Sequence, residues 1–172
     1  PQPAMGFTPG MEGAGEVTEV GPGVSDLKVG DRVAYAQPIG SYATERLAPA
    51  ERMVKIPDGI DYKTAAGMML QGMTVQYLIR RTYRVGPDST VLWHAAAGGV
   101  GLIAMQWLKS IGATVIGTAG GPEKCRVVVE DFGFDACIDY HEGGLDAALK
   151  LHCPHGVDVY FARQLVNERL SQ

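Results

Sequence analysis

The sequence predicts an α/β fold, a parallel β-sheet covered by helices, preceded by a smaller all-β region. Two observations predict it. From residue 91 onwards, short apolar runs alternate with segments of helical periodicity, whereas residues 10–57 hold short β-type runs separated by glycine and proline. Short apolar strands without polar alternation are typical of a parallel sheet that is buried on both faces. The 172 residues suffice for one sizeable core, or for two small units that share an interface.

The amino-terminal region is expected to form a barrel-like β meander. Its strands are predicted at residues 15–20, 31–36, 41–48 and 53–56. Turn chemistry separates them, as in Gly21-Pro22-Gly23, where glycine accepts a positive φ and proline pre-sets a negative one. Asp61 is then expected to cap a helix that ends near Tyr83, because apolar residues recur at helical spacing from Ala65 to Ile79.

Four strands and three helices are predicted for the second region. The strands are expected at residues 91–94, 114–118, 136–138 and 157–161, and the helices at 100–111, 123–132 and, more weakly, 145–151. The nearly uncharged stretch from Val91 to Leu108 is long enough to raise the question of a membrane span. Gly98, Gly99 and Gly101 interrupt it, so strand, tight turn and helix is the better interpretation.

The strongest local motif is Ala96-Ala97-Gly98-Gly99-Val100-Gly101, which has the spacing G-x-G-x-x-G with alanine in first place. It follows a predicted strand and begins a predicted helix. Glycines there allow a tight turn and let backbone N–H groups approach a diphosphate at the positive end of the helix. Gly98, Gly99 and Gly101 could alternatively serve only close helix packing, but the βαβ setting favours dinucleotide binding.

The second predicted strand indicates which dinucleotide. NAD sites usually carry an acidic residue about twenty positions after the glycine turn, where it holds the ribose 2′-hydroxyl. Here that place reads Gly117-Thr118-Ala119-Gly120-Gly121, with Lys124 and Arg126 close behind. The absence of a carboxylate and the nearby cations favour NADPH, with Lys124 as the first choice for the 2′-phosphate. The alternative for Lys124 is an ordinary solvated lysine.

Composition excludes several other classes of function. The net charge is −4 and no dense Lys/Arg stripe occurs, which argues against nucleic acid or an anionic membrane as the main partner. Three widely spaced cysteines indicate neither a disulfide framework nor a thiolate zinc site. The His152-Cys153-Pro154-His155 cluster lacks partners elsewhere and is interpreted as a loop, so no metal site is predicted. A reducing cytoplasm is the expected location.

Several motifs together resemble the zinc-independent NADPH:quinone oxidoreductases, the zeta-crystallin branch of the medium-chain dehydrogenase/reductase superfamily. They occur in the family's order and are Met11-Glu12-Gly13-Ala14-Gly15-Glu16-Val17, Gly30-Asp31-Arg32-Val33, Gln71-Gly72-Met73-Thr74 and His94-Ala95-Ala96-Ala97-Gly98-Gly99-Val100-Gly101. The resemblance implies an N-terminally truncated GroES-like catalytic domain at residues 1–75 and an incomplete Rossmann NADPH-binding domain at 76–161. Residues 162–172 depart from the family pattern, and we expect a helix from a discontinuous part of the chain; the alternative is a true fragment.

The resemblance also implies roles for particular residues. Thr74 is expected near the nicotinamide, Tyr140 beside the adenosine phosphate and Gly120 close to the cofactor. The residues alone also allow purely structural roles, because the hydroxyl of a helical threonine can hydrogen-bond to its own backbone and a tyrosine can lie on the surface. The predicted cofactor-binding set is Thr74, Gly98, Gly99, Val100, Gly120, Lys124 and Tyr140.

The same resemblance indicates the chemistry. Zinc-dependent relatives carry a histidine ligand before the glutamate that is matched by Glu12, where this sequence has Met11, a poor zinc ligand. Without a Lewis acid, hydride transfer from NADPH to an acceptor that is already electrophilic, a quinone, is the expected reaction. An enone or enoyl reductase and a non-catalytic crystallin-like or RNA-binding role are the alternatives. No catalytic acid can be named, and family members are usually homodimers.

Overall fold

The structure is a computed structural model that describes residues 6–161. The chain divides between Met73 and Thr74 into two compact units. The boundary lies within helix α1 (Tyr62–Gln76). Residues 162–172, for which a helix was predicted, lie outside the described residues.

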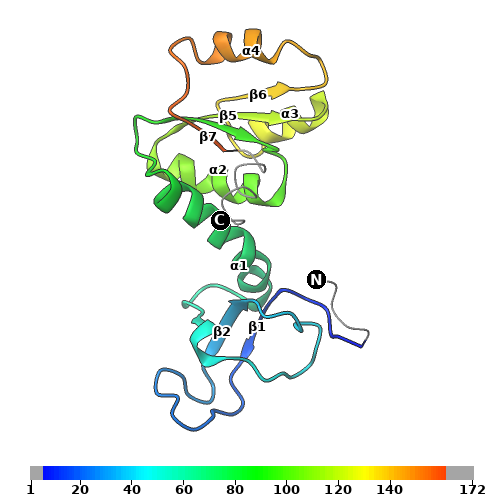
Figure 1. Ribbon diagram of the computed structural model, residues 1–172, viewed down its shortest axis with the longest axis vertical. Coiled ribbons are helices and arrows are strands. Elements are labelled where there is room, and N and C mark those ends of the chain that lie inside the picture. Colours follow the sequence, from blue (N-terminus) through cyan, green and yellow to red (C-terminus); the bar gives the residue numbers. More distant parts are fainter. Residues whose placement is uncertain (1–5, 162–172) are drawn as a thin grey trace. The chain divides into compact units, whose positions relative to one another are not determined.

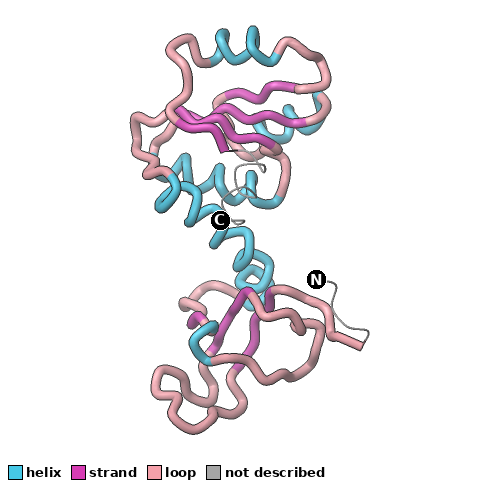
Figure 2. The backbone as a smooth tube through the Cα atoms, in the orientation of Figure 1, coloured by secondary structure: helices cyan, strands magenta, loops and turns pink. Residues whose placement is uncertain are grey.

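The described part of the first unit contains a three-stranded antiparallel sheet. It consists of β1 (Glu12–Glu16), β2 (Arg32–Ala36) and β3 (Val54–Lys55) in the order β1-β2-β3, and a short 3-10 helix, η1 (Ala50–Arg52), precedes β3. Ala14 pairs with Ala34, and Val33 pairs with Lys55. Figure 2 shows how much of this unit is loop. A small apolar cluster of Ala34, Ile56 and Ala65 joins the sheet to the start of α1.

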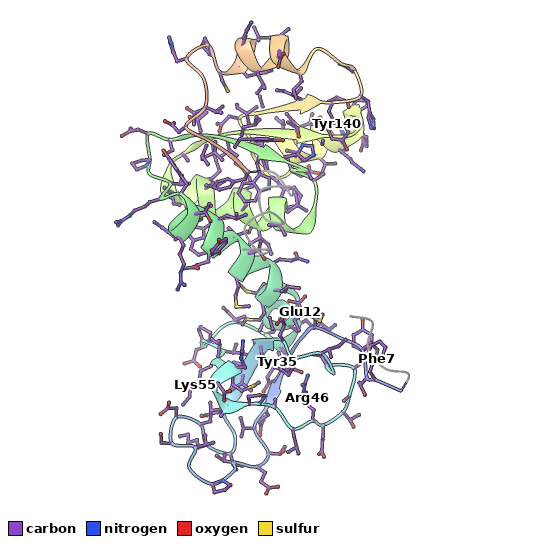
Figure 3. The ribbon with its side chains drawn as sticks, viewed as in Figure 1. Phe7, Glu12, Tyr35, Arg46, Lys55 and Tyr140 are labelled. Carbon is purple, nitrogen blue, oxygen red and sulfur yellow. The ribbon has the colours of Figure 1, made fainter. Side chains whose placement is uncertain are left out.

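Two of the strands predicted for this unit are wrong. The first begins at Glu12 and not at Gly15, because Gly13 lies against β2: a Cβ at Gly13 would be 2.9 Å from the Tyr35 hydroxyl. Residues 41–48 form no strand. The Arg46 guanidinium instead fixes this loop by donating hydrogen bonds to the Tyr35 hydroxyl (3.2 Å) and the Pro38 carbonyl (3.1 Å), and Figure 3 shows Tyr35 and Arg46 side by side.

The helix predicted from Asp61 is confirmed. A carboxylate oxygen of Asp61 accepts the Thr64 N–H at 2.7 Å, which is the expected amino-terminal cap. This hydrogen bond holds the pKa of the Asp61 carboxyl below its usual value. After α1 the chain continues in π-helical turns, η2 (Tyr77–Thr82), and reaches extended backbone at Tyr83, as predicted.

The described part of the second unit contains a four-stranded parallel sheet, which confirms the predicted fold class. The strands are β4 (Thr90–His94), β5 (Thr114–Ala119), β6 (Ala136–Asp139) and β7 (Val159–Phe161), in the order β6-β5-β4-β7. The helices between them are α2 (Gly99–Ile111), α3 (Pro122–Glu130) and α4 (Leu145–His152). Figure 1 shows α2 and α3 on one side of the sheet and α4 on the other.

Both faces of this sheet are apolar and covered, as the short apolar strands predict. Val91 and Trp93 of β4 belong to the larger core, which includes Met105 and Leu108 of α2 and Val128 of α3. Leu92, which points to the opposite face, belongs to a smaller core with Ile116 and Ile138, against which Leu149 of α4 packs. The carboxyl ends of the strands are thereby held in fixed register.

The helices of the described residues are all too short or too polar to cross a membrane.

Candidate functional site

The tight turn after β4 carries the glycine motif. It begins at Ala95, whose φ of +55° lies in the left-handed region that alanine rarely adopts. The Ala96 N–H donates to the Thr118 carbonyl at 2.9 Å, and the Gly98 N–H donates to the Ala95 carbonyl at 2.9 Å. These two hydrogen bonds join the turn to β5 and close it on itself, so the start of α2 is held at the carboxyl edge of the sheet.

The amino-terminal end of α2 offers backbone donors. Gly98 is the N-cap residue and, having no side chain, places none over the helix end. The first helical hydrogen bond runs from the Leu102 N–H to the Gly98 carbonyl at 3.0 Å, so the N–H groups of Gly99, Val100 and Gly101 precede the helical ladder. Such N–H groups and the positive end of the helix dipole favour an anion.

Gly101 has a packing role. A Cβ at this position would lie 2.3 Å from the Ala96 carbonyl oxygen and 2.8 Å from its carbon. Only glycine therefore lets α2 begin this close to the turn. The two interpretations of the glycines do not compete, because close packing at Gly101 is what brings the helix end to the turn.

A second glycine turn follows β5 and leads into α3. Gly121, at φ +99°, is the N-cap of this helix and also lacks a side-chain cap, and Pro122 follows it. Lys124 is exposed in the first helical turn. Arg126, in contrast, is ion-paired with Glu123 and with Glu130, each at 2.8 Å. Lys124 is thus the better of the two cations for binding an anion at this turn.

Tyr140, just after β6, covers the second turn. Its exposed fraction is 44%, and a Cβ at Gly120 would lie 2.6 Å from its hydroxyl oxygen. Its ring is 5.6 Å from the ring of His94, whose Nδ1 is 2.7 Å from the hydroxyl of the buried Thr118. Figure 3 shows Tyr140 beside the ends of β5 and β6. The structure therefore brings Gly120 and Tyr140 into contact, at the same edge of the sheet as the glycine motif.

Asp139 is a residue of this site that the sequence analysis missed. One of its carboxylate oxygens accepts the N–H of Gly121 at 2.9 Å and the N–H of His141 at 3.0 Å. These two hydrogen bonds, with the one from Gly121 first, lower the pKa of the Asp139 carboxyl. The side chain is only 8% exposed, and its carboxylate holds the second turn through these two hydrogen bonds.

Thr74 belongs to a different element. It is half-buried on α1, directly before Val75, which is fully buried in the larger core. Its expected place near a nicotinamide stays a prediction.

Within residues 6–161, no three or more His, Cys, Asp or Glu side chains gather in a way that could hold a metal ion. Met11, at the position of a histidine in zinc-dependent relatives, is 39% exposed. His152 ends α4, and Cys153 directly after it is buried.

A parallel sheet whose strand leads through a glycine turn into a helix is the architecture of dinucleotide-binding domains. Comparisons with known families and proteins agree with it. Residues 1–85 match the family model "Alcohol dehydrogenase GroES-like domain", and residues 99–166 match "Zinc-binding dehydrogenase". The chain therefore belongs to the medium-chain dehydrogenase/reductase superfamily, in the branch that contains the quinone oxidoreductases.

Curated relatives include the quinone oxidoreductase of Pseudomonas aeruginosa, which is 48% identical over 153 residues, or 88% of this chain and 47% of the relative. The 2-haloacrylate reductase of a Burkholderia species is 51% identical over 156 residues, 88% of this chain and 46% of the relative. Among solved structures, Escherichia coli quinone oxidoreductase complexed with NADPH has a TM-score of 0.83 and 42% identity, covering 90% of this chain and 47% of that one. The chain thus spans about half the length of the relatives it matches.

Proposed function

We propose that this protein is an NADPH-dependent oxidoreductase that transfers hydride to a quinone without zinc. The observation that carries the proposal is the amino-terminal end of α2, where the N–H groups of Gly99 and Val100 precede the helical ladder and no side chain caps the helix. The solved structures of related proteins include the Escherichia coli quinone oxidoreductase complexed with NADPH.

The residues present fit a dinucleotide. Gly98, Gly99 and Val100 would hold the diphosphate through the backbone at the α2 end. Gly120, Lys124 and Tyr140 would hold the adenosine end at the second turn, where the lack of a side chain at Gly120 lets the Tyr140 hydroxyl lie close to the backbone. Thr74 would lie at the nicotinamide end. When bound, NADPH supplies the hydride, and the protein supplies position and electrostatics.

The second turn favours NADPH over NADH. No carboxylate lies between Gly117 and Gly121, where NAD sites hold the 2′-hydroxyl. Asp139, at the end of the neighbouring strand, does lie beside this turn. One of its carboxylate oxygens already accepts two backbone N–H groups, so that oxygen is not available to a ribose hydroxyl. Lys124 stands in the first turn of α3 without the ion pairs that engage Arg126.

Met11 disfavours a catalytic zinc ion, because a thioether is a poor substitute for imidazole as a zinc ligand. Without a metal to polarise a carbonyl, an acceptor that is already electron-poor is the appropriate substrate. A quinone satisfies this condition, and relatives from several bacteria are named quinone oxidoreductases.

An enone or enoyl reductase on the same scaffold is the second candidate, favoured by the 51% identity to a 2-haloacrylate reductase. A conjugated acceptor of that kind accepts hydride without a metal for the same reason as a quinone. The acidic balance of the chain weighs against the RNA-binding alternative. The cytoplasmic location and the homodimer stay predictions.

The proposal is tested by following the absorbance of NADPH, first with an ortho-quinone and then with a medium-chain enone. Oxidation of NADPH by the quinone supports the first candidate, and activity on the enone alone favours the second. Titration with NADPH and NADH, repeated for Lys124→Ala, tests the cofactor. The variant should lose most of the preference for NADPH; an unchanged preference would show that Lys124 does not hold the 2′-phosphate.

A further inference from the structure

We propose that His141 is a further phosphate-binding side chain of the second turn, and that its protonation makes the preference for NADP(H) over NAD(H) depend on pH. The inference rests on the proposed function, which it deepens by adding a residue and a regulating condition. It follows from three features of the structure: the place of the imidazole, the buried carboxylate beside it, and the charges around both.

The imidazole of His141 lies over the second turn. A Cβ at Gly120 would be 2.9 Å from the His141 Cε1 atom and 2.6 Å from the Tyr140 hydroxyl oxygen, so both side chains stand above the same glycine. The two rings meet edge to face with their centroids 4.8 Å apart. A phosphate that reaches the Tyr140 hydroxyl therefore comes within range of the imidazole as well.

Asp139 fixes the backbone of this segment. Its carboxylate accepts the N–H groups of Gly121 and His141, which ties the two sides of the site together. The His141 side chain itself is 67% exposed, so it is open to a ligand, while the Asp139 side chain is 8% exposed. The backbone is held and the imidazole is accessible, as a ligand-binding side chain requires.

The charges around His141 make its protonation matter. Asp139 at the end of β6 is 3.9 Å from the imidazole Nδ1 and places a negative charge near the proposed phosphate. From α3, Lys124 adds a positive charge, and Glu123 is neutralised by Arg126. From β4, the ring of His94 contacts the ring of Tyr140. Glu142, the residue after His141, carries a further negative charge.

A protonated His141 would bind the phosphate together with Lys124 and would offset the charge of Asp139, whereas a neutral His141 would leave the carboxylate charge in place. Histidine is the side chain that changes charge between pH 5 and 8. We therefore expect selectivity for the 2′-phosphate to rise when His141 is protonated.

The test measures binding of NADP⁺ and NAD⁺, which tolerate acid, by calorimetry at several values between about pH 5.5 and 8. The 2′-phosphate itself titrates near pH 6, so the quantity compared is the ratio of the two dissociation constants in wild type and in His141→Asn at each pH. His155→Asn, a change at an exposed histidine after α4, is the matched control.

At the acid end, wild type should exceed His141→Asn in selectivity for NADP⁺ by about fivefold, the effect of one nearby charge under water-like screening. At pH 8 the two should converge, and His155→Asn should follow wild type throughout. His141→Lys, with a permanent charge, should keep the higher selectivity at pH 8. Superimposable profiles for wild type and His141→Asn would overturn this inference alone, whereas failure of wild type to bind either nucleotide would overturn the proposed function too.

Discussion

Gly101→Ala should weaken both the fold of the second unit and its affinity for a dinucleotide. The new methyl group would lie 2.3, 2.8 and 2.9 Å from the oxygen, carbonyl carbon and Cα of Ala96. All three are backbone atoms, so no side chain can rotate away. An ordinary carbon–oxygen contact needs about 1 Å more than the shortest of these distances. The start of α2 or the turn must therefore move.

The cost of that movement can be worked out from the contacts of the turn. Overpacking of this kind costs about 1–3 kcal/mol. If the turn moves, the hydrogen bond from the Ala96 N–H to the Thr118 carbonyl is strained as well, which adds about 1 kcal/mol. We expect the free energy of unfolding to fall by about 2–4 kcal/mol in total. Displaced N–H groups at Gly99 and Val100 should weaken NADPH binding at least about tenfold.

The assay is urea unfolding followed by tryptophan fluorescence, because both tryptophans, Trp93 and Trp107, lie in the second unit and report on it. Gly67→Ala is the matched control: Gly67 is exposed within α1, and a Cβ there meets nothing within 4 Å. Because Gly67 lies in the first unit, this change should leave NADPH affinity and the unfolding of the second unit unchanged. If Gly101→Ala unfolds and binds NADPH like wild type, the reasoning about the turn is wrong.

Three further outcomes follow from the same contacts. Gly120→Ala should weaken NADPH binding in a titration but leave the unfolding midpoint nearly unchanged, because the obstacles are the rotatable side chains of Tyr140 and His141. A large loss of stability would contradict this. Leu108→Ala, at a fully buried position, should lower the free energy of unfolding, measured in urea, by about 2–5 kcal/mol. A loss below about 1 kcal/mol would show that α2 packs less closely than described. Folding lowers the pKa of Asp61 and of Asp139, so the stability that these carboxylates contribute should be complete above about pH 5 and lost as the pH falls below about 4. In an acid titration, Asp139→Asn should lose less stability over that pH window than wild type.

The α/β half of the fold could be predicted closely from the sequence. Its strands are short and apolar on both faces, and its helices show clear periodicity, so the local pattern decides the structure. The glycine motif was found for the same reason: strand, turn and helix are contiguous in the chain from Thr90 to Ile111.

The all-β half was harder to predict because pairing, and not local sequence, makes its strands. The segment Glu12–Glu16 contains two glycines and an alanine and has little intrinsic strand preference, yet it pairs along its whole length with β2. Conversely, residues 41–48 have strand-like composition but are held as a loop by Arg46.

Asp139 and His141 were missed for a related reason. Their place depends on the parallel register that sets Ala119 beside Asp139, which joins β5 to a strand about twenty residues further along the chain. Sequence spacing pointed to the end of β5 for the residue that sets cofactor preference, whereas the further contribution that we propose comes from the end of the neighbouring strand. Lys124 and Tyr140 were named in advance, and their contacts with a cofactor stay predictions.

A crystal structure of the protein with NADPH, obtained by soaking or co-crystallisation, would locate the cofactor. The diphosphate should lie at the amino-terminal end of α2, within hydrogen-bond distance of the Gly99 and Val100 N–H groups, and the 2′-phosphate should lie beside Lys124 and Tyr140. A nucleotide bound elsewhere on the protein, or a site at the α2 end that stays empty at saturating NADPH, would contradict the proposed function.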